Sequence, residues 1–314
     1  MVIKAPTAAV KKILSYYESD NSKTKANLQK LLMHGRLGGT GKMIILPVDQ
    51  GFEHGPDRSF AVNPEAYDPH YLLKLGVDAG VSAFAGPLGM LEATFKTFGD
   101  KIPFILKMNS ANSLSRFKED ADQAVTATIQ DALRLKCAGI GFTLYPGSDA
   151  QFSMIEQLQL LSSEAKANGL VVVVWCYPRG GDVSKEGETA LDIVSYSAHM
   201  AALLGAHIIK VKLPSAHLEQ PEAKKAIEGA KIKTKDLADR VAHVIKCSFA
   251  GRRIVLFSGG ATKGVVDVLT ETKAIMAGGG HGSIIGRNCF QRPRTEALKL
   301  LEDMVKIYLG KAKS

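Results

Sequence analysis

Two lysines inside one apolar run are the residues best suited to covalent chemistry in this sequence. Lys210 and Lys212 lie in the run 206–213, which reads AHIIKVKL. Residues two apart on a β-strand point to the same face. In a confined apolar space, desolvation and mutual repulsion disfavour protonation of such amines, and an uncharged lysine attacks carbonyl groups to form imines. The alternative is that the strand ends early and both lysines are solvated.

Two aromatic residues end another apolar run. Trp175, the sole tryptophan, and Tyr177 lie two apart in the run 170–177 and therefore share a face. A phenol at a strand end could exchange protons with a group beside an imine. Packing in the core is the alternative role. Arg179 follows with two glycines, in a turn suited to anions.

Further polar residues follow the apolar run 43–48, namely Asp49, Gln50 and His54. A buried carboxylate is costly unless it is paired, so Asp49 either faces a site or serves as a helix N-cap or salt-bridge partner. His54 taken alone fits a structural role equally well. Lys107 stands at the end of the apolar run 104–108, where a charged side chain has no simple structural purpose.

A phosphate site is predicted from two glycine-containing segments near the end of the sequence. Ser258, Gly259 and Gly260 follow one apolar run, and Gly286 and Arg287 follow the next. Glycine lets backbone N–H groups approach an anion closely, and a helix N-terminus adds favourable partial charge. Barrel enzymes often bind phosphate with the loops after their last two strands.

The elements that must position these residues are eight short apolar runs separated by helical stretches. Near-continuous apolar runs are typical of parallel strands buried on both faces, and their alternation with helices predicts an α/β fold of the (β/α)8 TIM-barrel type. A doubly wound open sheet is the alternative, but no G-x-G-x-x-G follows the first run. The clearest crossover helices are expected at 120–138, 153–169, 189–205 and 233–250, and the strands at 43–48, 81–85, 104–108, 139–144, 170–177, 206–213, 253–257 and 283–286.

The barrel is expected to follow a helical extension. Apolar residues recur at helical spacing over 7–37, with a break at Asn21–Ser22. We therefore predict an N-terminal helical extension at 1–38 and a single catalytic barrel domain at 39–314. The stretch 50–70 is long and polar for a strand-to-helix loop and could cover the site.

The amino-acid composition indicates which classes of molecule the protein is expected to bind. The 314 residues carry a net charge of +9, which favours anionic partners. The basic residues are dispersed, so a phosphorylated small molecule fits better than nucleic acid. The four cysteines form no C-x-x-C pair, and no apolar run approaches the ~20 residues that span a bilayer. We expect reduced thiols, a cytoplasmic location and no membrane partner. The histidines form no zinc-binding pattern, so no metal and no cofactor are expected.

Four blocks of the sequence resemble the archaeal-type class I fructose-bisphosphate aldolases of the DeoC/FbaB family. They keep the family order and span most of the expected barrel. This sequence differs from the family after the lysine. Many family members continue with a Tyr-Thr-Gly-Asp-like stretch, whereas Leu213-Pro-Ser215 follows here. That difference leaves Lys212 open as the nucleophile. The four blocks are 47–55, 175–181, 205–212, and 258–260 with 286–288.

The resemblance implies a metal-free TIM barrel that cleaves fructose 1,6-bisphosphate reversibly, a step of glycolysis and gluconeogenesis. It implies Lys210 as the Schiff-base lysine, Tyr177 as the proton-transferring residue and Asp49 as an assisting carboxylate. It also implies a homo-oligomer, with a decamer as one form. The residues expected to bind substrate are Gln50, His54, Lys107, Trp175, Arg179, Lys212, Ser258, Gly259, Gly260, Gly286 and Arg287.

Two other functions remain compatible with the residues. One is an imine-forming aldolase or transaldolase that acts on another ketose phosphate, because loops set the specificity. The other is a phosphate-binding barrel without covalent chemistry, such as an isomerase or a sensor. That second function would tolerate loss of Lys210.

Overall fold

Eight parallel strands close into a barrel in the order β1-β10-β9-β8-β7-β6-β3-β2. The structure is a computed structural model, and it describes residues 5–114, 121–260 and 262–312. The (β/α)8 prediction is therefore confirmed over the doubly wound alternative. The barrel strands are β1 (Met43–Pro47), β2 (Ala83–Gly86), β3 (Phe104–Lys107), β6 (Gly139–Leu144), β7 (Val171–Cys176), β8 (Ile208–Lys212), β9 (Ile254–Ser258) and β10 (Gly282–Ile284).

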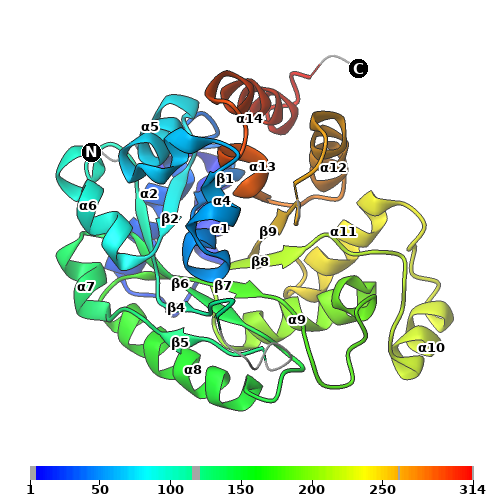
Figure 1. The fold of residues 1–314 in the computed structure, drawn as a ribbon. Helices are drawn as coiled ribbons and strands as arrows, with labels where there is room; N and C mark the ends of the chain where they lie inside the picture. The colour runs from blue at the N-terminus through cyan, green and yellow to red at the C-terminus, as the bar shows by residue number, and fades with distance from the viewer. Residues whose placement is uncertain (1–4, 115–120, 261, 313–314) are drawn as a thin grey trace.

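Helices surround the barrel on its outer face (Figure 1). The strands are buried on both faces, which is why their sequences read as unbroken apolar runs such as Val171–Val174. The outer helices are α5 (Pro69–Ala79), α6 (Leu88–Phe98), α7 (Ile129–Arg134), α8 (Gln151–Ala167), α9 (Leu191–Leu203), α11 (Leu237–Cys247), α12 (Val265–Ala277) and α14 (Arg294–Tyr308). Shorter elements lie in the loops: α3 (Gln50–His54), α4 (Pro56–Phe60), η1 (Pro64–Tyr67), η2 (Gly187–Thr189), α10 (Pro221–Gly229) and α13 (Arg287–Phe290).

The N-terminal helices α1 (Ala8–Ser15) and α2 (Ser22–Met33) pack against the beginnings of the barrel strands. Each starts with a side-chain cap, from Thr7 and from Asn21. Their apolar residues share one buried cluster with the first residues of several strands, Met43, Val171, Ile208 and Ile254 among them. The division into 1–38 and 39–314 stays a prediction, because this cluster joins the two parts.

Polar contacts reinforce this packing. The buried Tyr17 hydroxyl donates to the carbonyl of His207 at 2.6 Å. The His207 ring accepts from the backbone of Val172 through Nδ1, so its Nε2 proton points to Asp20 at 2.7 Å. His207 lies three residues before Lys210. The N-terminal helices are thus tied to the strand that carries the candidate nucleophile.

Replacing Tyr17 with Phe is expected to destabilise the protein by about 0.5–1.5 kcal/mol, the typical net contribution of a hydrogen bond. The hydroxyl also accepts from the N–H of Ile254 at 3.3 Å, but this N–H and the His207 carbonyl keep the 3.3 Å hydrogen bond between them, so neither is left without a partner. Urea unfolding of the variant measures the change. Tyr16→Phe removes the same atom from a half-buried ring and serves as the control, and equal stability of the two variants would contradict the prediction.

The predicted helix at 120–138 is wrong over its first half. The helix is α7, which begins after Thr128, whose side chain forms a reciprocal capping box with Asp131. Before it, β5 (Ala124–Val125) pairs antiparallel with β4 (Asn109–Ser110). Residue 120, where the predicted helix began, lies outside the described residues.

The stretch 50–70, predicted as a loop, is largely helical. It forms α3, α4, η1 and the start of α5, separated by Gly55 and by Pro residues that begin new turns. Gly55 adopts a φ of +82°, which ends α3 sharply. In the part of the chain that the structure describes, no helix is long and apolar enough to cross a membrane.

Candidate active site

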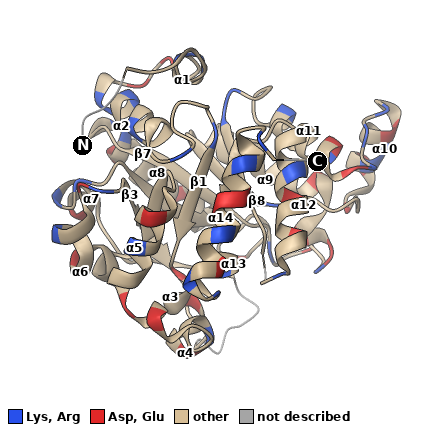
Figure 2. Cartoon of the chain, turned by 90° about the horizontal axis from the view of Figure 1, so that it is seen from above, with Lys and Arg blue, Asp and Glu red and all other residues tan. Residues whose placement is uncertain are grey.

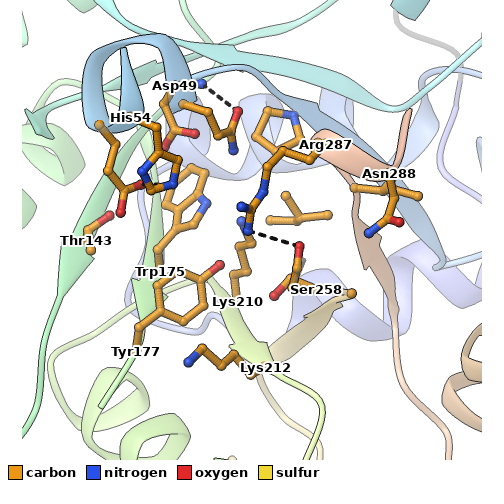
Figure 3. Close-up of a pocket in the computed structure, with 18 of the residues that line it drawn as sticks. Asp49, His54, Thr143, Trp175, Tyr177, Lys210, Lys212, Ser258, Arg287 and Asn288 are labelled. Atoms are coloured by element: carbon orange, nitrogen blue, oxygen red, sulfur yellow. Dashed lines mark hydrogen bonds and ion pairs between the residues drawn. The ribbon is translucent and has the colours of Figure 1, made fainter. Parts of the chain in front are cut away.

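A cavity of about 240 Å³ opens at the carboxyl ends of the barrel strands. This is the end at which barrel enzymes place their sites. Every predicted site residue lines it except Lys107. Figure 3 shows residues from β7, β8, the end of β9 and the segment after β1 converging on this space. The residues that the sequence predicted and the cavity contains are Asp49, Gln50, His54, Trp175, Tyr177, Arg179, Lys210, Lys212, Ser258, Gly259, Gly260, Gly286 and Arg287.

Lys210 projects from β8 between two aromatic rings. Its side-chain nitrogen lies 5.5 Å from the ring centre of Trp175 and 5.4 Å from that of Tyr177 (Figure 3). It has no hydrogen bond or ion pair to any residue that the structure describes. Burial lowers the pKa of Lys210 to about 8, against the opposing pull of Asp49 and Glu53. A buried amine with a lowered pKa and no partner is a competent carbonyl nucleophile.

Lys212 lies on the same face of β8, but its ammonium is already engaged. Its Nζ donates to Glu188 Oε2 at 2.7 Å. The low pKa of Lys210 comes first from burial, and Arg287 is the cation that lowers it further, so the expected repulsion by Lys212 is not the cause. The geometry therefore favours Lys210 over Lys212 as nucleophile.

Trp175 occupies the centre of the barrel because Gly141 leaves room for it. A Cβ atom at position 141 would lie 2.1 Å from the indole ring. Residue 141 and Trp175 belong to neighbouring strands, β6 and β7. The indole N–H is buried and has no hydrogen-bond partner among the described residues. The indole ring thus packs beside Lys210, and its N–H is available to donate a hydrogen bond to a ligand.

Tyr177 stands at the end of β7 with its hydroxyl directed into the cavity (Figure 3). Desolvation raises the pKa of the phenol, the nearby Asp49 and Glu53 carboxylates add to this, and a hydrogen bond with Ser258 opposes it. The phenol is therefore protonated at neutral pH. A protonated phenol next to a lysine nucleophile can deliver a proton to a carbanion formed there.

Two carboxylates face the cavity from the segment after β1. Asp49 occupies the N-cap position of α3, yet its side chain makes no capping hydrogen bond, so the capping alternative is not what the structure shows. Glu53 lies one turn further and is 3.9 Å from His54 Nε2. Burial lowers the pKa of His54, and the Glu53 carboxylate opposes this. His54 is therefore mainly neutral at pH 7.

The opposite side of the cavity is suited to an anion. Ser258 ends β9, Gly259 and Gly260 follow it, and the Arg287 guanidinium donates to the carbonyl of Gly260 at 3.2 Å. This contact joins the loops after the last two strands, and both loops border the cavity. A guanidinium beside exposed glycine backbone matches a phosphate group.

Several cavity residues escaped the sequence reasoning. Thr143 and Tyr145 lie at the carboxyl end of β6, where the rule used for the other strands would have found them. Glu53 and Asn288 belong to blocks that were recognised without assigning these two side chains a role. Gln123 reaches the cavity only through the β4–β5 pairing, for which two-residue strands leave no pattern. The remaining lining residues are Pro47, Ile284 and Ile285.

Lys107 has a different environment from the one predicted. It is 2% exposed, lies outside the cavity lining and hydrogen-bonds to Asn109 and Gln123. In the described part of the chain, no group of three or more His, Cys, Asp or Glu residues is arranged to hold a metal ion.

A partner-free lysine inside an eight-stranded barrel, with a phenol beside it and an anion site opposite, defines an imine-forming aldolase. The chain matches the family model described as "DeoC/LacD family aldolase" over residues 43–292, and it belongs to this family. The resemblance drawn from the four sequence blocks is thereby confirmed.

Individual relatives agree with this family. The class 1 fructose-bisphosphate aldolase of Thermoproteus tenax is 34% identical over 271 residues, covering 86% of this chain and 90% of the relative. A solved archaeal fructose-1,6-bisphosphate aldolase, whose catalytic Lys is covalently bound to the carbinolamine intermediate of its substrate, is 31% identical with a TM-score of 0.74, covering 90% of this chain and 98% of that one. The fructose-bisphosphate aldolase of Slackia heliotrinireducens has a TM-score of 0.79 at 25% identity, covering 99% of this chain and 91% of that one.

Proposed function

We propose that this protein is a Schiff-base class I aldolase that reversibly cleaves fructose 1,6-bisphosphate to dihydroxyacetone phosphate and glyceraldehyde 3-phosphate. The observation that carries the proposal is Lys210, a buried amine without a partner at the cavity of the barrel. The relatives that share most of the chain bear the same activity in their names.

The first half of the reaction is imine formation. The anion site at Ser258, Gly260 and Arg287 holds the phosphate next to the ketone, and this fixes the carbonyl carbon beside Lys210. The neutral amine attacks that carbon, and the carbinolamine loses water to give an iminium. The iminium accepts the electron pair of the C3–C4 bond.

The second half is cleavage and proton transfer. A base removes the proton of the C4 hydroxyl, with Asp49 as the assisting carboxylate, and glyceraldehyde 3-phosphate leaves. The enamine that remains on Lys210 takes a proton from Tyr177. Water then hydrolyses the iminium and frees dihydroxyacetone phosphate. Gln50, His54, Trp175, Arg179 and Lys212 line the same cavity and are assigned to binding the rest of the substrate.

Borohydride trapping tests this proposal. The protein is incubated with dihydroxyacetone phosphate, reduced with sodium borohydride and digested for peptide mass spectrometry. A stable adduct on Lys210 is expected. If neither this ketone nor fructose bisphosphate gives any adduct, the imine mechanism is refuted and a non-covalent phosphate-binding barrel is favoured. A panel of ketose phosphates then separates fructose bisphosphate from the substrates of related aldolases and transaldolases.

Imine formation is expected to slow as the pH falls below about 8. Only the neutral amine attacks a carbonyl, and the pKa of Lys210 is lowered to about 8, so a rising pH increases the reactive fraction. At pH 6 the rate constant should be about a hundredfold below its alkaline plateau. Rapid quench into borohydride at a series of pH values measures it. A flat profile between pH 6 and 9 would contradict the assignment of a neutral lysine.

A homo-oligomer, with a decamer as one form, is the proposed assembly. Large apolar side chains stand exposed on α8, with Phe152 at 71% and Leu160 at 67%, and on α9, with Tyr196 at 56% and Leu203 at 66%. Large exposed apolar patches mark protein–protein contacts, and these side chains are the candidates for such a contact. Light scattering coupled to size exclusion gives the mass, and a monomer that persists at micromolar concentration would refute the assembly.

The proposed setting is the cytoplasm, with a sugar phosphate as partner. The four cysteines form no disulfide, and Cys137, Cys176 and Cys289 are buried as free thiols. Positions of Lys and Arg lie beside positions of Asp and Glu along α14 in Figure 2, and such mixed charge suits a small anionic ligand better than a nucleic-acid backbone. Cell fractionation with antibody detection would reveal any other location.

A further inference from the structure

The Gln291 side chain joins the loop after β9 to the helical segment after β1. Its Oε1 accepts a hydrogen bond from the Thr262 hydroxyl at 2.8 Å. Its Nε2 donates to the backbone carbonyls of Arg58 and Ser59, at 3.3 and 2.9 Å. The reverse orientation of the amide would turn its oxygen towards two carbonyl oxygens, so these partners fix the orientation. Gln291 itself does not line the cavity.

The first partner of this amide belongs to the loop on the anion side of the cavity. Thr262 lies two residues after Gly260, which lines the cavity. The next residue, Lys263, is held from the same direction, because its backbone N–H donates to Asn288 Oδ1 at 2.7 Å. Side chains that follow β10 therefore set the position of the loop to which the substrate phosphate is assigned.

The other two partners are carbonyl groups at the end of α4. A helix cannot satisfy its own last carbonyl groups, and Gln291 binds two of them. Phe60, the last residue of α4, contacts Phe290 with 5.8 Å between the ring centres. Phe60 also lies against Gly51 of α3, where an added Cβ atom would be 3.0 Å from the Phe60 ring. The position of α4 therefore sets that of α3, which lies beside the two carboxylates of the cavity.

These contacts fix the spacing between the anion site and the carboxylates. In the proposed reaction, imine formation needs only the ketone and its phosphate, whereas cleavage also needs a base at the C4 hydroxyl. A displacement of about 1 Å in a catalytic group can cost about 10²-fold in rate. Cleavage is therefore the step that depends on both segments being held at one spacing.

We propose that Gln291 is a positioning residue that sets the spacing between the phosphate-binding loop and α3, and thereby aligns a ketose 1-phosphate for cleavage. The proposal rests on the aldolase function proposed above. Because Gln291 lies outside the cavity lining, it acts through Thr262 and α4 rather than on the substrate.

Gln291→Met tests the proposal, because methionine has a similar length but carries no amide and adds no charge near the anion site. Borohydride-trapped imine formation with dihydroxyacetone phosphate should stay within about threefold of the wild-type rate. The kcat/KM for cleavage of fructose bisphosphate should fall by about 10–100-fold. If imine formation and cleavage fall by the same factor, Gln291 is merely structural and the proposal is refuted. Unchanged cleavage would refute it as well.

The matched control removes an amide at the other end of the barrel. Asn27 of α2 is half-buried like Gln291, and its Nδ2 donates to the Gly169 carbonyl at 2.8 Å. Asn27→Leu should change imine formation and cleavage by the same factor per folded molecule, with the folded fraction measured by thermal unfolding. If Asn27→Leu slows cleavage selectively, as expected for Gln291→Met, the effect does not arise from the spacing and the proposal is overturned.

Thr262→Val tests the same link from its other end and covers the case in which Gln291→Met does not fold. The Thr262 side chain is exposed, so the variant should fold. Cleavage should fall by about 2–10-fold, the factor that corresponds to one net hydrogen bond. Added to Gln291→Met, the substitution should cost nothing more, because the hydroxyl acts only through Gln291. Cleavage at the wild-type rate in Thr262→Val, or losses that multiply in the double variant, would contradict the proposal.

Failure of the proposed aldolase function gives a different result. In that case the wild-type protein forms no adduct with dihydroxyacetone phosphate. Failure of the inference about Gln291 leaves the wild-type adduct and the wild-type cleavage intact.

Discussion

Lys210→Met is expected to abolish adduct formation and to lower kcat/KM for fructose bisphosphate by a factor on the order of 10⁴ or more, as loss of a covalent nucleophile typically does. Methionine has nearly the shape of lysine and fills the same space between Trp175 and Tyr177, so the barrel should stay folded. Coupled assay of triose phosphate release and intact mass after borohydride reduction measure both effects. Circular dichroism confirms that the variant is folded.

The matched control is Lys212→Met, on the same face of the same strand. It breaks the contact with Glu188, so substrate binding should weaken, but the adduct on Lys210 should still form. The opposite pattern, with an adduct in Lys210→Met and none in Lys212→Met, would make Lys212 the nucleophile. An unchanged cleavage rate in Lys210→Met would remove the imine mechanism altogether.

Tyr177→Phe is expected to separate imine formation from proton transfer. The variant loses only the hydroxyl, so Lys210 should still be trapped with dihydroxyacetone phosphate. Turnover should fall by about 10²–10⁴, the usual contribution of a general acid or base. The exchange of the C3 proton of dihydroxyacetone phosphate with deuterated solvent, followed by NMR, measures enamine protonation directly and should fall by a similar factor.

Tyr145→Phe is the control for this experiment, because Tyr145 also lines the cavity but bonds to Gln123. Burial raises the pKa of Tyr145 to about 12, so it too is a protonated phenol at neutral pH. Its loss should leave C3 proton exchange much closer to the wild-type rate than the loss of Tyr177. If Tyr145→Phe stops exchange and Tyr177→Phe does not, the proton donor is Tyr145.

The barrel was predictable from the sequence because parallel strands buried on both faces leave an unmistakable apolar pattern. The run Val171–Val174 is an example, and β-branched residues reinforce it. The helix predicted at 120–138 was wrong over its first half, because a short strand pairing forms there instead of the helix. Residues 121–128 carry residues compatible with a helix, yet the β4–β5 pairing and the cap at Thr128 delay the helix to Ile129.

The site was predictable as far as it lies at strand ends. Tyr177, Asp49 and Arg287 were predicted because a polar residue at or after the end of an apolar run reaches the mouth of a barrel, and Lys210 because it lies inside such a run. The hydrogen-bond and ion-pair partners of each charged side chain were not predictable, because these partners are distant in sequence. Glu188, which bonds to Lys212, follows β7 rather than β8, and Gln123, which bonds to Lys107, stands immediately before the two-residue strand β5, which no periodicity marks.

The packing of the N-terminal helices has a consequence for how the chain acquires its structure during synthesis. The Tyr17 hydroxyl meets His207 and Ile254, which follow it by 190 and 237 residues. Contacts of such high sequence separation form late, since loop-closure entropy must be overcome first. On the ribosome, α1 and α2 emerge early with their apolar stripes uncovered and wait for β9 to be made. The apolar faces of α1 and α2 can therefore be covered completely only after β9 has been made, and until then they are surfaces on which the growing chain can aggregate.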